Sequence, residues 1–186
     1  MAYETISVAP IAGALGAEVS GVDLARKLPD ATIAEIRQAL LTHLVIFFRD
    51  QHLTPEQHLA LGRRFGPLQV HDFVEAMPNY PEILEVRKEP EETRNFGGGW
   101  HTDVSYLERP SLGSLLYALE APEYGGDTLF ANQYLAYETL SDGMKQMLRR
   151  ADCDAQRPAA VRHQRGERPG VRSLLDALQL QREGAR

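Results

Sequence analysis

The sequence is poor in cysteine, in long apolar runs and in excess positive charge. Cys153 is the single cysteine among 186 residues, so no disulfide can form within the chain. The longest apolar run, LVIFF at 44–48, is far shorter than the ~20 residues that cross a bilayer, and the start of the chain does not resemble a secretory leader. A net charge of −6 argues against a general nucleic-acid binder, because neutralising the phosphates of a nucleic acid needs a basic face. We therefore expect a cytoplasmic protein with a small-molecule ligand, no nucleic-acid partner and no membrane span.

Aromatic residues are absent from the end of the chain. All fourteen lie within residues 1–150, whereas residues 151–186 contain seven arginines and no lysine. An ordinary polar tail would explain this change, and RSLLDALQL at 172–180 could form a short helix there. We expect one domain over residues 1–150 and a poorly packed, non-matching tail over residues 151–186.

Residues 1–150 carry the patterning of one globular domain, in line with 43% hydrophobic and 25% charged residues overall. Apolar and alternating segments bounded by Pro and Gly predict many short strands. The expected strands are at 6–10, 17–24, 43–50, 67–73, 82–87, 101–106, 112–119 and 127–131. Such a pattern indicates a mainly β domain, a sandwich or barrel, with flanking helices.

Helix signals occur at three places. Asp30 is expected to cap a helix with an apolar face that includes Ile33 and Ile36. Thr54, followed by Pro55 and by Gln57 three residues on, predicts a capping box at the start of a second helix that ends near Gly66. A third helix is expected after Ser141.

The segment GGGWHTDVSY at 97–106 carries the clearest chemical signal. On a strand, His101 and Asp103 would point to the same face, because side chains alternate with a period of two. An imidazole nitrogen beside a carboxylate oxygen suits Fe(II), Mn(II) or Zn(II). The same two residues can equally form a simple hydrogen-bonded pair, so the motif alone leaves both interpretations open.

Longer segments around this motif carry a family resemblance. They are GAEVSGVDL, LVIFFRDQHLTPEQHLALGRRFGPLQVH, NFGGGWHTDVSYLERPSLGSLLYALEAPEYGGDTLFAN and AYETLSDGMKQMLRR, in this order over residues 5–150. The chain resembles the taurine and 2,4-dichlorophenoxyacetate dioxygenase family of Fe(II)- and 2-oxoglutarate-dependent oxygenases. The resemblance implies a double-stranded β-helix (jelly roll) fold.

The resemblance also assigns roles to individual positions. It implies Fe(II) ligands at His101 and Asp103, 2-oxoglutarate contacts at Thr128 and Asn95, and substrate contacts at His71, Val104 and Phe73. The alternatives are a hydrogen-bonded strand histidine at 71, a plain turn before Thr128 and a flexible loop around Asn95. Val74 stands where the family has a tyrosine, which leaves taurine itself in doubt as the substrate.

Part of the family pattern has no counterpart in this sequence. The second ligand histidine and the arginine that pairs with 2-oxoglutarate lie far downstream in the family, so we expect an incomplete jelly roll. His163, the one histidine in the tail, lies in VRHQRGERPG, which matches nothing in the family. The ten residues LRRADCDAQR at 148–157 can be encoded by a base string that changes its reading frame when one C is removed. In that frame it encodes a sequence that resembles the continuation found in the family. We hypothesise a frameshift near residue 150.

Three functions follow as hypotheses. The first is a dioxygenase that uses O2 to hydroxylate a small anionic organic acid, such as a sulfonate, sulfate ester or aryloxyacetate, impaired by the missing part. The second is a non-catalytic fragment or defective gene product, which could associate with another subunit through an exposed edge. The third is a metal hydrolase that uses His71, His101 and Asp103. A homo-oligomeric state is left open.

Overall fold

The structure is a computed structural model that describes residues 3–71, 74, 76–89, 91, 93 and 98–151. The described residues divide into two compact units. The first unit consists of the described residues of Met1–Val70, Ala76–Ile83 and Leu115–Asn132, and the second of those of His71–Glu75, Leu84–Ser114 and Gln133–Arg186.

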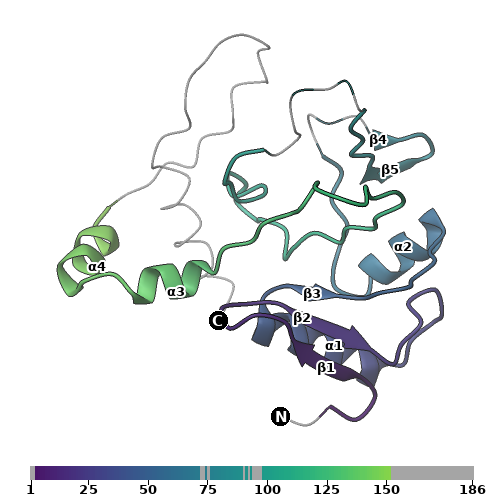
Figure 1. Cartoon of the computed structure of the whole chain (residues 1–186), viewed down its shortest axis with the longest axis horizontal. Helices are drawn as coiled ribbons and strands as arrows, with labels where there is room; N and C mark the ends of the chain where they lie inside the picture. The colour runs from purple at the N-terminus through teal and green to yellow at the C-terminus, as the bar shows by residue number, and fades with distance from the viewer. Residues whose placement is uncertain are drawn as a thin grey trace. The chain divides into compact units, whose positions relative to one another are not determined.

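A three-stranded sheet with one helix on it forms the centre of the first unit (Figure 1). Strand β1 (Ser7–Pro10) pairs antiparallel with β2 (Ala17–Ser20), with Val8 opposite Val19. Strand β3 (Ile46–Phe47) pairs parallel with β2. Parallel neighbours need a crossover connection, and α1 (Asp30–His43) provides it. These elements confirm the strands expected around 6–10, 17–24 and 43–50, although each is shorter than expected.

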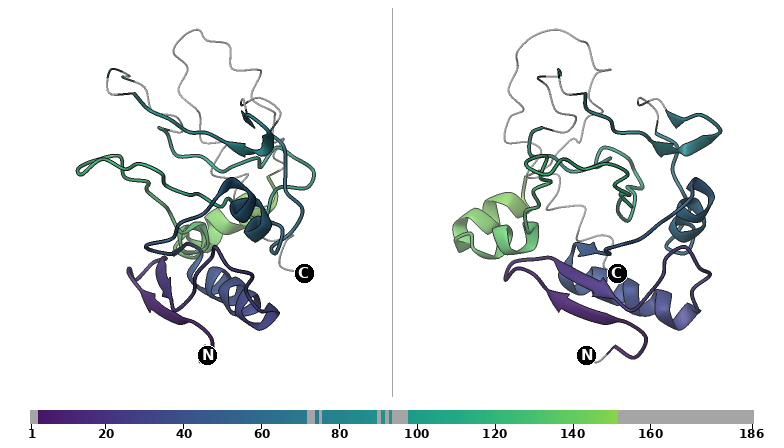
Figure 2. Two further views of the ribbon diagram at one scale, coloured as in Figure 1. Left: turned by 90° about the vertical axis from the view of Figure 1, so that its right-hand side faces the viewer. Right: turned by 45° about the vertical axis from the view of Figure 1, so that its right-hand side comes forward.

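The buried core lies where α1 packs against this sheet, as the two views of Figure 2 show. Ile33, Ile36 and Ala39 recur at helical spacing and are buried on one face of α1. Their partners from the sheet and the adjoining segments include Ile6, Val19, Leu24 and Leu61. Burial of this one apolar stripe therefore explains why the segment forms a helix at this place.

The start of α1 differs from the expectation. Asp30 is the first helical residue, and Pro29 occupies the capping position with no side-chain cap hydrogen bond. The Asp30 carboxylate instead accepts a hydrogen bond from Arg64. Proline suits this position because its fixed φ leads into a helix. The prediction that Asp30 caps the helix is wrong.

Helix α2 (Pro55–Gly62) begins as the sequence predicts. The Gln57 N–H donates to Thr54 Oγ1 (3.3 Å), and the Thr54 N–H donates to Gln57 Oε1 (2.8 Å). These two bonds form the reciprocal capping box, which satisfies two backbone donors that the helix itself leaves unpaired. The helix ends at Gly62, before the expected Gly66.

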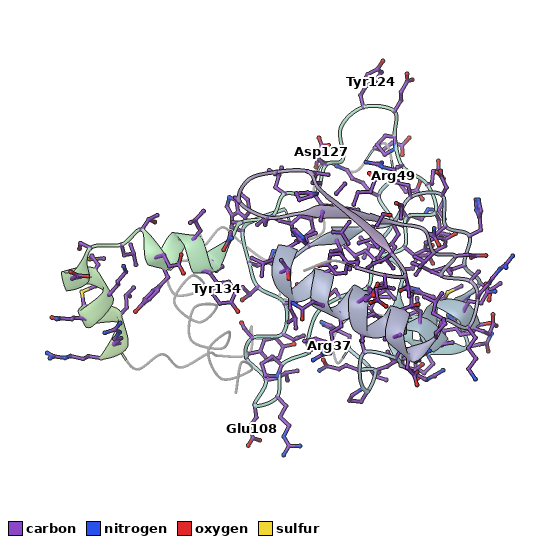
Figure 3. All side chains as sticks on the ribbon, turned by 90° about the horizontal axis from the view of Figure 1, so that it is seen from below. Arg37, Arg49, Glu108, Tyr124, Asp127 and Tyr134 are labelled. Carbon is purple, nitrogen blue, oxygen red and sulfur yellow. The ribbon has the colours of Figure 1, made fainter. Side chains whose placement is uncertain are left out.

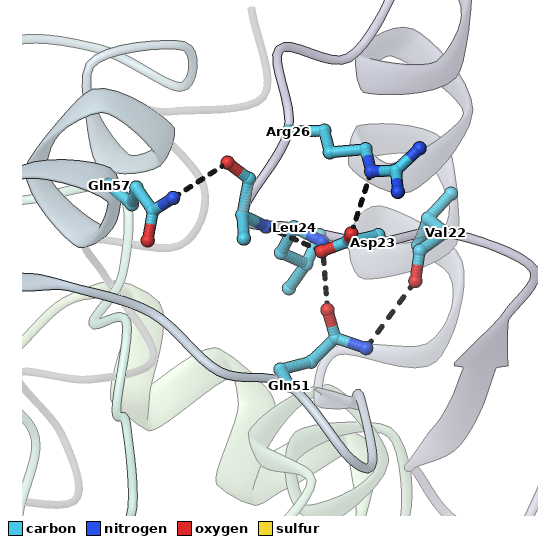
Figure 4. Close-up of polar contacts among 7 residues, drawn as sticks. Val22, Asp23, Leu24, Arg26, Gln51 and Gln57 are labelled. Atoms are coloured by element: carbon cyan, nitrogen blue, oxygen red, sulfur yellow. Dashed lines mark hydrogen bonds and ion pairs between the residues drawn. The ribbon is translucent and has the colours of Figure 1, made fainter.

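Two glutamines connect the segment before α1 to the segment around α2 (Figure 4). Gln51 accepts from the Leu24 N–H (2.8 Å) and donates to the Val22 carbonyl (3.4 Å). The Gln57 amide nitrogen donates to the Ala25 carbonyl (3.1 Å). The two side chains thus satisfy backbone groups of residues 22–25, which belong to no strand and have no ladder partner.

Tyr117 joins a later segment of the chain to the same region of the first unit. Its hydroxyl accepts from the Leu53 N–H (3.1 Å) and donates to the Gln51 carbonyl (3.2 Å). Nε2 of His58, on α2, lies 3.1 Å from the Leu115 carbonyl. These bonds fix residues 115–117 beside α2.

The remaining strands form a hairpin of β4 (Ala76–Met77) and β5 (Tyr80–Leu84), which overlaps the strand expected near 82–87. The Tyr80 hydroxyl donates to the Glu56 carboxylate of α2. This hydrogen bond lowers the pKa of Glu56 and raises the pKa of Tyr80. The turn between the strands contains Asn79 with a positive φ of 68°.

The second unit contains the helices α3 (Gln133–Glu138) and α4 (Asp142–Arg149). Ser141 caps α4 by accepting from the Met144 N–H (3.3 Å), which confirms the helix expected after Ser141. The longest described helix is α1, with 14 residues. None of the helices in the described ranges combines the length and hydrophobicity needed to cross a membrane.

Several expected strands do not form. Residues 67–71, 101–106, 112–119 and 127–131 have no strand assignment. A strand exists only where a neighbour completes its hydrogen-bond ladder, and the described residues give these segments no such neighbour. The part of the chain that the structure describes is therefore a mixture of short sheets and helices rather than a mainly β domain. The jelly roll remains a proposal.

Candidate metal centre

His101 and Asp103 lie side by side in the second unit, as expected. His101 Nε2 is 3.2 Å from Asp103 Oδ1. On its other side, the ring donates from Nδ1 to the Gly99 carbonyl (2.7 Å), and Asp103 Oδ2 accepts from the Ser114 hydroxyl (3.2 Å). Both side chains are more than half exposed, at 53% and 62%. The pair is thus open to a ligand from solvent.

The hydrogen bond to Gly99 determines which ring nitrogen is available. A carbonyl can only accept, so Nδ1 carries a proton and Nε2 of the neutral ring has a lone pair facing Asp103 Oδ1. Two lone pairs at this distance repel each other unless a proton or a cation lies between them. An imidazolium paired with the carboxylate would supply the proton, and a bound metal would supply the cation.

The separation of the two atoms fits a divalent metal. Imidazole nitrogen and carboxylate oxygen bind zinc at about 2.1 Å, and two such ligands at a right angle lie about 3 Å apart. The distance between His101 Nε2 and Asp103 Oδ1 is 3.2 Å. The pair therefore could provide two adjacent ligands of one ion with little movement.

Val104 explains why this segment is not a strand. Its φ of 47° lies in the left-handed region, which is strained for a β-branched residue. The chain turns there, with the Leu107 N–H donating to the Val104 carbonyl (3.1 Å). Glu108 projects outward just beyond this turn (Figure 3). The strand expected at 101–106 is wrong, and the two side chains approach each other from the segment that leads into this turn. Val104 is half-buried next to Asp103, and its substrate role remains a prediction.

His71 lies in the same unit but not in the metal centre. Its Nδ1 accepts a hydrogen bond from the Val74 N–H (3.2 Å). The described residues contain no group of three His, Cys, Asp or Glu side chains placed to hold a metal, so His71 does not complete a site with His101 and Asp103. This arrangement removes support from the metal-hydrolase hypothesis, whereas substrate binding by His71 stays a prediction.

Thr128 belongs to the first unit, and it is exposed. The turn expected before it is present, since Gly125 and Gly126 have φ values of 78° and 73°. Tyr124 projects from the end of this loop, away from the ribbon, and Asp127 lies on the same loop (Figure 3). Thr128 follows this turn in a segment without a strand assignment. Its contact with 2-oxoglutarate remains a prediction.

Two of the predicted site residues and the tail fall outside the described residues. These are Asn95, Phe73 and residues 152–186, including His163. The roles given to them from the sequence therefore stay predictions. Reasoning from the sequence missed Ser114 and the Gly99 carbonyl, which hold the two candidate ligands. The glycines before His101 indicated that the backbone could come close to its ring. No pattern in SLGSLL predicted that Ser114 would contact Asp103.

Comparison with known proteins identifies the family. Residues 7–178 match the model of the taurine catabolism dioxygenase TauD, TfdA family, a range that extends into the segment after residue 150. An alpha-ketoglutarate-dependent sulfate ester dioxygenase of Pseudomonas putida is 34% identical over 143 residues, which cover 76% of this chain and 46% of that protein. Alpha-ketoglutarate is another name for 2-oxoglutarate.

Two further similar proteins agree with this match. An (S)-phenoxypropionate/alpha-ketoglutarate-dioxygenase of Sphingobium herbicidovorans is 34% identical over 141 residues, covering 74% of this chain and 49% of that protein. The crystal structure of a taurine dioxygenase from Burkholderia xenovorans aligns with a TM-score of 0.67 at 39% identity, covering 78% of this chain and 51% of that one. The chain spans about half the length of the relatives it matches. The chain belongs to the TauD/TfdA family of 2-oxoglutarate-dependent dioxygenases.

Proposed function

We propose that this chain carries the His101–Asp103 part of the Fe(II) site of a 2-oxoglutarate-dependent dioxygenase that hydroxylates a small anionic organic acid. The observation that carries the proposal is the 3.2 Å approach of His101 Nε2 to Asp103 Oδ1, with Nδ1 held by the Gly99 carbonyl. Relatives that act on a sulfate ester and on phenoxypropionate support a sulfonate, sulfate ester or aryloxyacetate as the substrate class.

The residues of this chain would share the work in the following way. His101 and Asp103 would bind Fe(II) through Nε2 and Oδ1. Bound iron, together with 2-oxoglutarate and O2, supplies the oxidising power for hydroxylation. Thr128 and Asn95 would bind 2-oxoglutarate, while His71, Phe73 and Val104 would bind the substrate.

The family fold gives this proposal a structural setting. We infer that residues 1–150 form part of a jelly roll, whose remaining strands correspond to the half of the relatives that the chain does not match. The segments at 112–119 and 127–131 support this inference, since they have no strand assignment and no ladder partner among the described residues. The change in composition after residue 150 supports the proposal that residues 151–186 are a separate, out-of-frame tail, whereas the family match that runs to residue 178 counts against it.

Binding of Fe(II) tests the proposal directly. Anaerobic equilibrium dialysis of the full 186-residue chain should show weak but measurable binding, because two ligands hold iron less firmly than three. His101→Ala and Asp103→Asn should each lower the affinity by at least about tenfold. His52→Ala, which removes an exposed histidine elsewhere, is the matched control and should bind like the wild type. Equal binding by all four proteins would refute the assignment.

A second candidate function comes from the missing third ligand. The described residues place no further His, Cys, Asp or Glu with His101 and Asp103, so the chain could act as a non-catalytic fragment. Release of succinate from 2-oxoglutarate by the purified chain separates the two candidates. Slight turnover above the metal-only background favours an impaired enzyme, and no turnover despite Fe(II) binding favours the fragment.

A further inference from the structure

We propose that Ser114 is a positioning residue for Asp103, a role that rests on the proposed function. The Ser114 hydroxyl donates to Asp103 Oδ2 at 3.2 Å. The other carboxylate oxygen, Oδ1, faces His101 Nε2, also at 3.2 Å. The two oxygens therefore have different partners. Ser114 holds one of them and leaves the other beside the imidazole.

An anchor of this kind matters because burial does not hold the carboxylate in place. The Asp103 side chain is 62% exposed, and the last torsion of an aspartate is broad and roughly twofold. Rotation about that torsion would exchange Oδ1 and Oδ2 or turn both away from His101. A hydrogen bond to one of the two oxygens favours one orientation of the carboxylate, so the Ser114 hydroxyl, at 3.2 Å from Oδ2, opposes this rotation.

His101 has a corresponding restraint on its far side. Its Nδ1 donates to the Gly99 carbonyl at 2.7 Å, which orients the ring and presents Nε2 to the ligand position. Metal-binding histidines commonly donate their second N–H in this way, and such outer contacts raise metal affinity. The backbone supplies the restraint on His101, whereas a side chain supplies the one on Asp103. Only the second can be removed by a substitution.

The test uses Mn(II) as the probe and the full chain as the protein. Titration followed by the EPR signal of free Mn(II) gives the affinity of the wild type and of Ser114→Ala, Ser114→Thr and His101→Ala. We expect Ser114→Ala to bind about tenfold more weakly. Ser114→Thr keeps the hydroxyl and should bind close to the wild type. Urea unfolding without metal should give the same unfolding midpoint for the wild type and Ser114→Ala, because the hydroxyl is exposed.

The outcomes separate this proposal from the proposed function. Weaker binding by His101→Ala but wild-type binding by Ser114→Ala would overturn the role of Ser114 and leave the metal site standing. Equal binding by the wild type and His101→Ala would overturn the metal site itself. A loss in Ser114→Thr as large as in Ser114→Ala would also overturn the role, because the hydroxyl would then not be the cause. If Ser114→Ala unfolds more easily, recovery of binding in Ser114→Thr decides in favour of the hydroxyl.

Discussion

At the scale of single residues, backbone conformation decides what several positions do. Val104 has a φ of 47° between Asp103 and the rest of its turn, and Leu44 has a φ of 66° where α1 ends. Side chains with a branched or bulky Cβ rarely adopt such angles, because Cβ then approaches the following carbonyl. At Val104 this local conformation redirects the chain after Asp103 into a turn that is closed by the bond from the Leu107 N–H to the Val104 carbonyl.

Asn79 allows the cost of the left-handed conformation to be measured at an exposed site. It lies in the turn between β4 and β5 with a φ of 68°, which asparagine tolerates better than most residues. We expect Asn79→Val to lower the free energy of unfolding by about 1–2 kcal/mol. Asn79→Gly, the matched control, should leave it equal or higher, since glycine adopts this φ freely. Urea unfolding of the three proteins gives the comparison, and no difference between Val and Gly would contradict the assigned turn.

At the scale of elements, side chains connect the helices to strands and loops of the first unit. Glu35 of α1 illustrates this, because its carboxylate accepts from the Glu4 N–H (2.8 Å), the Thr5 N–H (2.9 Å) and the Thr5 hydroxyl (2.9 Å). The pKa of Glu35 is below its usual value of 4.5, first because of the Glu4 N–H and then because of the Thr5 N–H. The ionised form thus stabilises the approach of the segment before β1 to α1.

Stability should therefore depend on pH through Glu35. A carboxyl group whose pKa is lowered by folding contributes stability above its unfolded pKa, near 4.5, and loses it as the pH falls through the folded pKa. Glu35→Gln should lower the free energy of unfolding at pH 7, and its difference from the wild type should shrink as the pH falls below 4.5. Urea unfolding at several pH values measures this. Glu108→Gln, which removes the same charge from an exposed turn, is the control; a pH-independent difference for Glu35→Gln would contradict the account.

The sequence predicted those elements whose signals are local. The capping box of Thr54 and Gln57 and the cap at Ser141 involve residues within one turn, so their patterns could be interpreted directly. Strands after residue 66 were predicted less well, because a ladder depends on partners far along the chain. In the candidate site, the spacing of His101 and Asp103 predicted their approach, but not the turn that begins at Val104 in place of a strand.

At the scale of the whole molecule, the described core belongs to the first third of the chain. The described residues that are fully buried and apolar all fall between Ile6 and Leu61, while Leu116, Leu119 and Leu129 are 71–82% exposed. Those later residues lie in segments that have no strand partner among the described residues. Together with the match to about half of each relative, this pattern supports an incomplete version of the family fold.

The central claim is that His101 and Asp103 form one part of a dioxygenase site whose remaining groups lie outside this sequence. The measurement is succinate release from 2-oxoglutarate under Fe(II), ascorbate and O2, with a panel of sulfonates, sulfate esters and aryloxyacetates. It is made on the 186-residue chain, on a chain whose reading frame is restored after Arg149, and on the restored chain carrying His101→Ala. The account predicts negligible release by the first, substrate-dependent release by the second and its loss in the third. Robust release by the 186-residue chain, or release by the restored chain that His101→Ala leaves unchanged, would contradict it.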